Sequence, residues 1–231
     1  MSEKIVKLGY PIYEGMPVYP GLPEVKVTLK EDKKKGDPWN GSVLSIYLHA
    51  GTHVDAPFHH FNDSPLGIDG IPADHFVYDH PLVIDIDVTE KDQLITVEDL
   101  KAAGDALYEA DFLIFNTGAY KKRDKDFMDF ATGFATVSPE AAQFIRQNLP
   151  KVKAVGTDTL SIENIPNGSE DGFSVHKAFL DPGGKNSLIL IYEDLNIAPI
   201  VSKKIQSIFC TPLSIVGKDA SIVNPFARIE D

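Results

Sequence analysis

The sequence is poor in several features, and each scarcity excludes a class of protein. Cys210 is the only cysteine, so an internal disulfide is impossible and a reducing compartment is expected. No run approaches the roughly 18 apolar residues of a membrane-spanning helix, and the first residues lack the apolar core of a signal peptide. We therefore expect a cytoplasmic protein without membrane association.

Basic residues are also scarce relative to acidic ones. The chain has 22 Lys and Arg against 34 Asp and Glu, which gives a net charge of −12. Nucleic-acid backbones and anionic membranes attract clustered cations. The one dense basic run, residues 33–35, precedes a Gly-Asp-Pro turn and fits a solvated loop. A small-molecule substrate is therefore a better partner for this chain than a nucleic acid or a membrane.

The length and composition are those of a folded domain. Of the 231 residues, 43% are hydrophobic and 24% are charged, values that lie close to the globular average. No internal repeat or long linker divides the chain, so we expect residues 1–231 to form a single domain.

Strand patterns outnumber helix patterns. Runs of β-branched and aromatic residues between turn residues predict strands at residues 25–29, 43–48, 82–88, 112–115, 154–156, 188–192 and 205–215. Capping residues predict one helix from Thr96 to about residue 108 and another that starts at Ser138 and stops before Pro150. A short helical turn is expected at residues 175–180. The mixture predicts an α/β or α+β domain.

The richest chemistry lies in residues 49–61, HAGTHVDAPFHHF, which hold four of the seven histidines and an aspartate. Imidazole and carboxylate are ligands that borderline transition metals prefer. In an extended strand His49 and His53 would lie roughly 13 Å apart, too far to share a metal ion. Gly51 and Pro57 oppose a helix. We therefore predict a strand that turns sharply at Gly51, which can supply the unusual dihedral angles.

The turn would bring three ligands together. His53 and Asp55 are two residues apart, so they point to the same side of extended backbone and would fold back toward His49. Three protein ligands are the number expected for a catalytic metal with an open position for water. A divalent ion lowers the pKa of such a water toward about 7, which gives a hydroxide that attacks a carbonyl. The alternative, ordinary loop histidines, is disfavoured by this concentration around one turn.

The end of the segment supplies a candidate for proton transfer. The stiff exit at Pro57 would present His59 to the same cavity, where its imidazole could pass a proton to a leaving group. His60 would point the opposite way in an extended chain and stay outside the site. His75 and His80 flank an apolar segment and are expected at the surface or the edge of the core.

Residues 49–59 resemble the His-x-Gly-Thr-His-x-Asp-x-Pro-x-His signature of the cyclase family of metal-dependent hydrolases, which includes bacterial kynurenine formamidases and isatin hydrolases. The motif is specific because it fixes seven positions of mixed chemistry. The likeness continues in GTDTLS at residues 156–161, in a stretch that begins at His176, in YEDL at residues 192–195 and in a C-terminal pattern over residues 211–228.

The resemblance implies a metal site and a reaction. The metal ligands that it implies are His49, His53, Asp55, His176 and Glu193. Asp55 would bridge two ions, and His59 would transfer a proton. The implied cofactor is a divalent metal, zinc as a binuclear pair, with a single manganese as the alternative. The implied reaction is hydrolysis of the C–N bond of a formamide, amide or lactam, as in an arylformamidase.

Other functions remain open on these residues. A lactone or cyclic-imide hydrolase could use the same site, and so could a lyase or dehydratase that uses the metal as a Lewis acid. A non-enzymatic metal-binding or sensing module would need closed coordination and no proton-transfer residue. His59 and the open ligand position both argue against such a module.

The resemblance also implies a fold and an assembly, and it leaves two residues undecided. The fold would be a swivelling β/β/α domain with a mixed-sheet or barrel-like core and peripheral helices, assembled as a homodimer or homotetramer. Asp194 stands where the family commonly has Asn, and it is either a partner that orients a ligand or a surface charge. Trp39, the only tryptophan, lies either in a surface turn or, with residues 10–19, in an aromatic substrate pocket.

Overall fold

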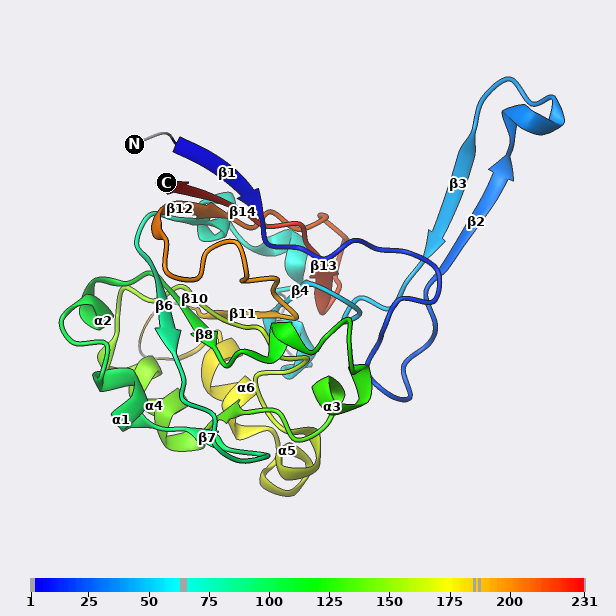
Figure 1. Cartoon of the computed structure of the whole chain (residues 1–231). Coiled ribbons are helices and arrows are strands. Elements are labelled where there is room, and N and C mark those ends of the chain that lie inside the picture. Colours follow the sequence, from blue (N-terminus) through cyan, green and yellow to red (C-terminus); the bar gives the residue numbers. More distant parts are fainter. Residues whose placement is uncertain (1–2, 63–65, 185, 187, 231) are drawn as a thin grey trace.

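The computed structural model describes residues 3–62, 66–184, 186 and 188–230. A small antiparallel sheet, a larger mixed sheet and a group of helices stack in three layers (Figure 1). The expected mixed α/β class, with a mixed sheet and peripheral helices, is confirmed.

The larger sheet forms the middle layer. Its strand order is β13-β4-β11-β10-β8-β6, in which β6, β8, β10 and β11 run parallel and β4 pairs antiparallel with both β11 and β13. The strands are β4 (His53–Asp55), β6 (Pro81–Asp85), β8 (Phe112–Asn116), β10 (Ala154–Thr157), β11 (Leu190–Glu193) and β13 (Ala220–Ile222).

The smaller sheet joins the two ends of the described chain. Its order is β1-β14-β12-β5, and all its pairs are antiparallel. Its strands are β1 (Glu3–Lys7), β5 (Val77–Tyr78), β12 (Lys204–Phe209) and β14 (Phe226–Glu230). A separate parallel pair consists of β7 (Leu94–Ile95) and β9 (Thr136–Val137).

Two apolar cores rest on opposite faces of the larger sheet. In β8, Leu113 and Phe115 belong to the core under the helices, whereas Phe112 and Ile114 belong to the core under the small sheet. Because both faces are covered, the central strands consist of nearly continuous apolar residues. Cys210 lies in the second core with 1% of its surface exposed.

The helices cover the face of the larger sheet opposite the small sheet. They are α1 (Val97–Lys101), α2 (Ala106–Glu109), α3 (Phe127–Ala131), α4 (Pro139–Asn148), α5 (Ile165–Asp171) and α6 (Ser174–Leu180). None of the helices in the described part of the chain combines the length and apolar character needed to span a membrane.

Helix starts are better predicted than helix and strand ends. Ser138 caps α4 as expected, since its Oγ accepts a hydrogen bond from the Ala141 N–H at 3.1 Å. The single helix expected from Thr96 to residue 108 is wrong: it divides at Gly104, which has a φ of +66°. The strand expected at residues 205–215 ends at Phe209 in β12.

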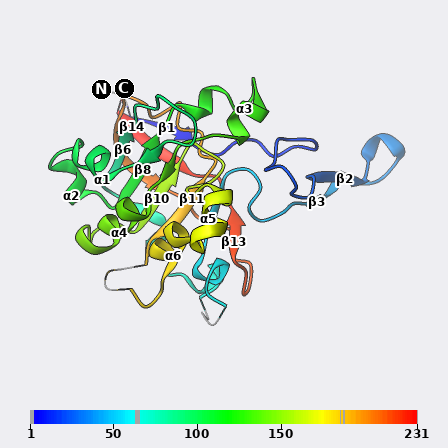
Figure 2. The ribbon, with the colours of Figure 1, turned by 90° about the horizontal axis from the view of Figure 1, so that it is seen from below.

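A two-stranded hairpin projects from the body of the molecule (Figures 1 and 2). It consists of β2 (Lys26–Glu31) and β3 (Gly41–Ser45), and most of its residues are exposed. The register places Val27 opposite Leu44, so these side chains share an apolar face with Leu29, which is 50% exposed. At the tip, Lys33–Lys35 form a solvated 3₁₀ turn, as predicted. An isolated hairpin is at best marginally stable in water.

Candidate metal centre

β4 carries the first part of the site. Gly51 has a φ of +70°, in the left-handed region that favours glycine, and the chain turns there as predicted before it enters β4. His53 and Asp55 then point to the same side of the strand. His49 folds back, and the centroids of the His49 and His53 rings lie 5.1 Å apart. The predicted turn therefore brings these three residues together.

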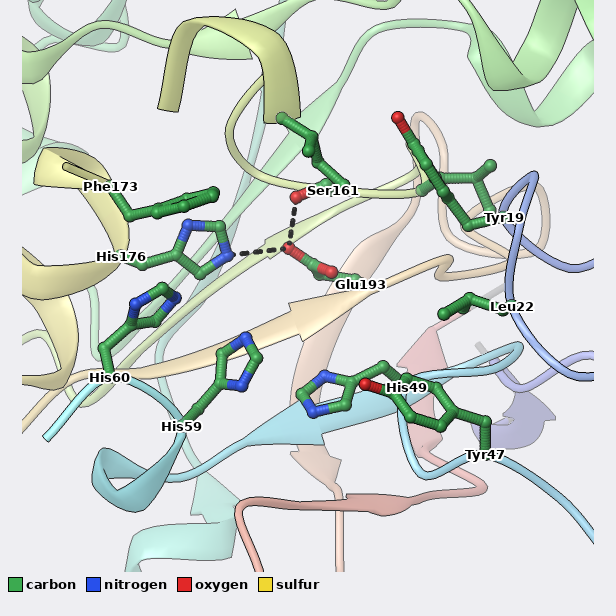
Figure 3. Close-up of a pocket in the computed structure, with 12 residues that line it drawn as sticks. Tyr19, Leu22, Tyr47, His49, His59, His60, Ser161, Phe173, His176 and Glu193 are labelled. Carbon is green, nitrogen blue, oxygen red and sulfur yellow. Dashed lines mark hydrogen bonds and ion pairs between the residues drawn. The ribbon is translucent and has the colours of Figure 1, made fainter. Parts of the chain in front are cut away.

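Neighbouring elements deliver the two distant residues. β11 pairs with β4 in a register that places Glu193 opposite His53. His176 comes from α6, which packs against β11, and Figure 3 shows its ring facing the Glu193 carboxylate. The structure thus brings together all five residues that the sequence proposes as metal ligands: His49, His53, Asp55, His176 and Glu193.

His53 presents a lone pair to the centre. Its Nδ1–H donates to the Gly51 carbonyl at 2.8 Å, so Nε2 of the neutral ring is unprotonated. Nε2 lies 3.4 Å from Asp55 Oδ1 and 3.3 Å from Glu193 Oε2. It is buried without a hydrogen-bond partner in the described part of the chain. A lone pair held among carboxylate oxygens is an arrangement that favours a cation.

His176 is oriented in the same way by a carboxylate. Its Nδ1–H donates to Glu163 Oε2 at 2.6 Å, and the backbone N–H groups of Val175 and His176 hold Glu163. The other ring nitrogen, Nε2, lies 3.6 Å from Glu193 Oε1. A carboxylate that fixes the far nitrogen of an imidazole is the usual support of a metal-binding histidine.

Asp55 is the least satisfied of these groups. It is fully buried, and neither side-chain oxygen has a hydrogen-bond partner among the described residues. His49 Nδ1 approaches Oδ1 to 2.9 Å, but the contact lacks hydrogen-bond geometry. The other nitrogen of His49 contacts Asp219 Oδ2 at 2.8 Å. If that nitrogen carries the proton, a neutral His49 faces Asp55 with a second lone pair, and a proton or a metal ion must separate them.

The charges around His49 agree with this arrangement. Burial alone would lower the pKa of His49, but the carboxylates of Asp55 and Asp219 outweigh burial and raise it to about 9. Without a metal, a proton on His49 therefore neutralises part of the acidic cluster. A divalent ion would supply the same positive charge.

The distances fit a divalent ion. Two atoms that bind one ion at about 2.0–2.2 Å each lie within about 4.4 Å of each other. The five candidate ligands approach one another at 2.9 to 3.9 Å. Asp55 belongs to two groups, one with His53 and Glu193 and one with His49 and His59. The buried orphan atoms and these spacings together identify a site that could hold one ion or two.

His59 lies where the sequence places it, but the expectation for His60 is wrong. The centroid of the His59 ring is 4.2 Å from that of His49. Residues 57–59 form a 3₁₀ turn rather than extended chain, so neighbouring side chains do not point in opposite directions. The His60 ring lies 4.9 Å from the His176 ring. Burial and the nearby His176 and His59 lower the pKa of His60 to about 3, so the ring is neutral.

A cavity of about 220 Å³ opens beside these groups (Figure 3). Its remaining walls are formed by Ser161, whose hydroxyl donates to Glu193, and by aromatic or aliphatic residues: Tyr19, Leu22, Tyr47, Leu160, Ile165 and Phe173. Trp39 does not belong to this set of described lining residues and is 61% exposed, which favours the surface-turn interpretation. Tyr19, the last residue of the segment 10–19 that was expected to join Trp39 in an aromatic pocket, does line the cavity.

Asp194 is a buried positioning residue rather than a surface charge. Its two carboxylate oxygens accept hydrogen bonds from Arg123 Nε at 2.7 Å and Nη2 at 2.6 Å. The Tyr10 ring lies 3.8 Å from the guanidinium of Arg123. Thr52 Oγ1 donates to the Asp194 carbonyl at 2.6 Å. Asp194 therefore links the Gly51 turn to the strand end that carries Glu193.

Sequence reasoning missed Asp219, Glu163 and Arg123 as members of the site. Asp219 lies inside the C-terminal family pattern, but only the pairing of Ala220 with Asp55 shows that it reaches the centre. Glu163 follows GTDTLS by two residues, and its role depends on the position of α6. Arg123 lies in a connecting segment that no motif covers. His75 lies apart and contacts the Leu188 carbonyl at 2.9 Å.

Comparisons with known proteins show what the chain is similar to. The model of a family described as "Putative cyclase" matches residues 6–164. A kynurenine formamidase from Sphingopyxis alaskensis is 26% identical over 226 residues, which cover 97% of this chain and 98% of the relative. A structure from Bacillus stearothermophilus, described as a "predicted metal-dependent hydrolase", is 27% identical with a TM-score of 0.74 and covers 99% of each chain.

A third comparison concerns the fold alone. Isatin hydrolase A from Labrenzia aggregata superposes with a TM-score of 0.83 at 20% identity, over 99% of this chain and 94% of the other. The fold is therefore shared over almost the whole length.

The Arg123–Asp194 pair yields a test of stability. We expect Arg123→Met to lower the free energy of unfolding by about 3–5 kcal/mol, because it leaves the Asp194 carboxylate buried and unpaired. Adding Asp194→Asn to that variant should recover most of the loss, since Asn keeps the shape and tolerates the φ of +51° at this position. Urea denaturation of both single variants and the double variant measures the coupling. Additive losses would contradict the pairing.

Proposed function

The chain belongs to the cyclase family, and we propose that it is a metal-dependent hydrolase that cleaves the C–N bond of a formamide, amide or lactam. The observation that carries the proposal is Asp55, whose buried oxygens have no hydrogen-bond partner among the described residues and lie among imidazole nitrogens and Glu193. A buried charge of this kind needs a cation beside it. Similarity to a kynurenine formamidase over nearly the full length supports an amide-type bond as the target.

The chain supplies both the ligands for a metal ion and a cavity through which a substrate can reach them. His49, His53, Asp55, His176 and Glu193 would hold the ion, and Glu163 and Gly51 fix two of the imidazoles through Nδ1. A divalent ion bound there supplies Lewis acidity for a substrate carbonyl and activates water for attack. The apolar walls of the cavity exclude bulk water and leave the substrate carbonyl to face the ligands.

We propose zinc as the resident metal, with manganese as the alternative. Three imidazoles and two carboxylates suit zinc, and the carboxylates also accommodate manganese. Because Asp55 belongs to two ligand groups, we propose that the site would hold a pair of ions, with Asp55 available to both.

His59 is placed to deliver a proton. Its ring forms part of the cavity wall, and Nδ1 lies 3.7 Å from Asp219 Oδ2, an oxygen that His49 also contacts. The Asp219 carboxylate lies close enough to orient the ring toward the cavity. His59 can therefore hold a proton beside the cavity and pass it to the departing nitrogen.

We also propose that residues 1–231 act as a single cytoplasmic domain in a homodimer or homotetramer. The two cores share one six-stranded sheet, which supports a single unit. The hairpin supports self-association: its apolar face is uncovered, and residues 26–45 carry five Lys against three acidic residues in a chain of net charge −12. A second copy offers the acidic surface that complements this arm.

Metal removal tests the proposed function. The purified protein should contain at least one equivalent of a transition metal, lose hydrolysis of formanilide after chelation and regain it with zinc or manganese, because the ion supplies the Lewis acid. Elemental analysis and release of aniline measure the two properties. Hydrolysis that continues in the metal-free protein would refute the proposal.

Replacement of His59 tests the proton-transfer role. His59→Ala should retain the metal and lower kcat by about 10²–10⁴-fold, the usual contribution of a general acid or base. His80→Ala changes an exposed histidine that is not among the cavity residues, and it should match the unaltered protein in metal content and turnover. Loss of metal from His59→Ala would instead make His59 a ligand.

The hairpin can be tested by size-exclusion chromatography with light scattering. The unaltered protein should be a dimer or tetramer, and Leu29→Glu with Leu44→Glu should dissociate it because two charges then occupy the apolar face. Thr28→Glu, on the opposite face of the same hairpin, should leave the assembly intact. A monomeric unaltered protein, or an assembly that survives the double substitution, would contradict the proposed contact.

A further inference from the structure

Outside its histidine cluster, the cavity beside the metal centre has no cationic side chain among the described residues. The described residues that line it include neither Lys nor Arg. Its charged or titratable members are His49, His59, His60, His176 and Glu193, which form or adjoin the metal centre. The walls that would contact the rest of a substrate are apolar or phenolic, apart from the Ser161 hydroxyl, which donates to Glu193 Oε1. A substrate carboxylate would therefore enter this cavity without a partner.

The neighbouring hollow does not supply a cation either. It shares Tyr19 and Ile165 with the cavity, so the two spaces adjoin across these side chains, and its volume is about 300 Å³. Its one charged member among the described residues is Asp92, which accepts a hydrogen bond from Asn164 Nδ2 at 2.8 Å. A substrate that extended into this hollow would meet a negative charge.

Two cations near the site, Arg123 and Lys177, do not line the cavity. Arg123 is 2% exposed and directs its guanidinium to Asp194. Lys177, on α6, lines a separate hollow together with Arg146. The chain as a whole carries a net charge of −12, which disfavours the approach of anions.

We propose that the enzyme acts on uncharged, compact aromatic amides or lactams and discriminates against substrates with a carboxylate, including α-amino acids. This inference rests on the proposed hydrolase function and specifies its substrate class. The cavity of about 220 Å³ is smaller than the ~300–1,000 Å³ of sites for drug-sized ligands, so it fits one or two rings. The Tyr47 ring, whose centroid is 5.5 Å from that of His49, provides an aromatic wall next to the reacting bond.

The cost of an added carboxylate follows from burial. An ionised group taken from water into an apolar space without a partner is strongly disfavoured. Among the described lining residues, positive charge could come only from the metal and the histidines around it, and a substrate bound there through its carboxylate would hold the amide away from the ligands. Both effects lower kcat/KM for a charged substrate relative to a neutral one of the same shape.

Two formanilides of similar shape test the inference. In 4-isopropylformanilide the ring carries an uncharged branched group, and in 4-formamidobenzoate it carries a carboxylate of similar size. After division by the alkaline hydrolysis rate constant of each compound, kcat/KM of the zinc- or manganese-loaded protein should be at least about 30-fold higher for the isopropyl compound. The assay uses the assembled protein, so a cation contributed by a second copy would also be detected.

A charge introduced at the rim should weaken the preference. Ile165 is 37% exposed and lines both hollows. Ile165→Lys should lower the ratio of the two kcat/KM values by about tenfold or more, because the ammonium group pairs with the carboxylate. Ile165→Met, a neutral side chain of similar length, should keep the ratio of the unaltered protein.

The outcomes separate this inference from the proposed function. Equal kcat/KM values, or a preference for the carboxylate, in the unaltered protein would overturn the inference and leave the hydrolase function intact. Failure to hydrolyse either compound with either metal would remove the proposed function and the inference together. An unchanged ratio in Ile165→Lys would also overturn it, because the lining would then not set the preference.

Discussion

The burial of Asp55 is the constraint on which the rest of the site depends. Asp55 lies on β4, which pairs antiparallel with β11 on one side and β13 on the other, and its side chain is fully buried. Neither carboxylate oxygen has a hydrogen-bond partner among the described residues. The groups around it, imidazole nitrogens and the Glu193 carboxylate, can satisfy it only through a shared positive charge. Such an arrangement costs folding free energy when it is unoccupied. The buried Asp55 carboxylate is therefore explained by the cation that it binds and not by a contribution to the stability of the fold.

The elements around Asp55 make this arrangement possible by fixing every other side chain. Gly51 accepts the left-handed conformation that turns His49 back toward β4. Backbone and carboxylate acceptors hold the far nitrogens of His53 and His176, so neither ring can rotate away. The Ile162 N–H and the Ser161 hydroxyl hold one oxygen of Glu193. Rigid support of this kind keeps the centre assembled before any metal binds.

The sequence predicts this centre well where its geometry is local. The spacing of His49, His53 and Asp55 around Gly51 is enough to derive the turn, because a strand and a helix both fail to bring the three together. The same local reasoning misplaces His60, since the 3₁₀ turn at residues 57–59 replaces the extended chain that it assumes. His176 and Glu193 depend on family resemblance, because nothing in their own neighbourhood shows that they meet.

The remainder is non-local and could not be derived from patterns. The α/β class follows from the apolar strands, but the order of the sheet and the antiparallel insertion of β4 do not. Asp219 reaches the centre only because β13 pairs beside β4, and Arg123 matters only because Asp194 is buried beneath it. Motif glycines are a partial exception: a Cβ at Gly156 would lie 2.7 Å from Leu195 Cδ1, so close packing explains that position.

The sharing of one sheet by two cores has a consequence for how the molecule comes apart. The side chains of the middle strands alternate between the two apolar cores. If either the helices or the small sheet were lost, one apolar face of these strands would be exposed to water. We therefore expect the helices and the small sheet to unfold as one cooperative unit. The hairpin lies outside this unit, and in a free protomer it is the segment at which a protease would first find accessible backbone, while the layers that carry the histidines stay closed.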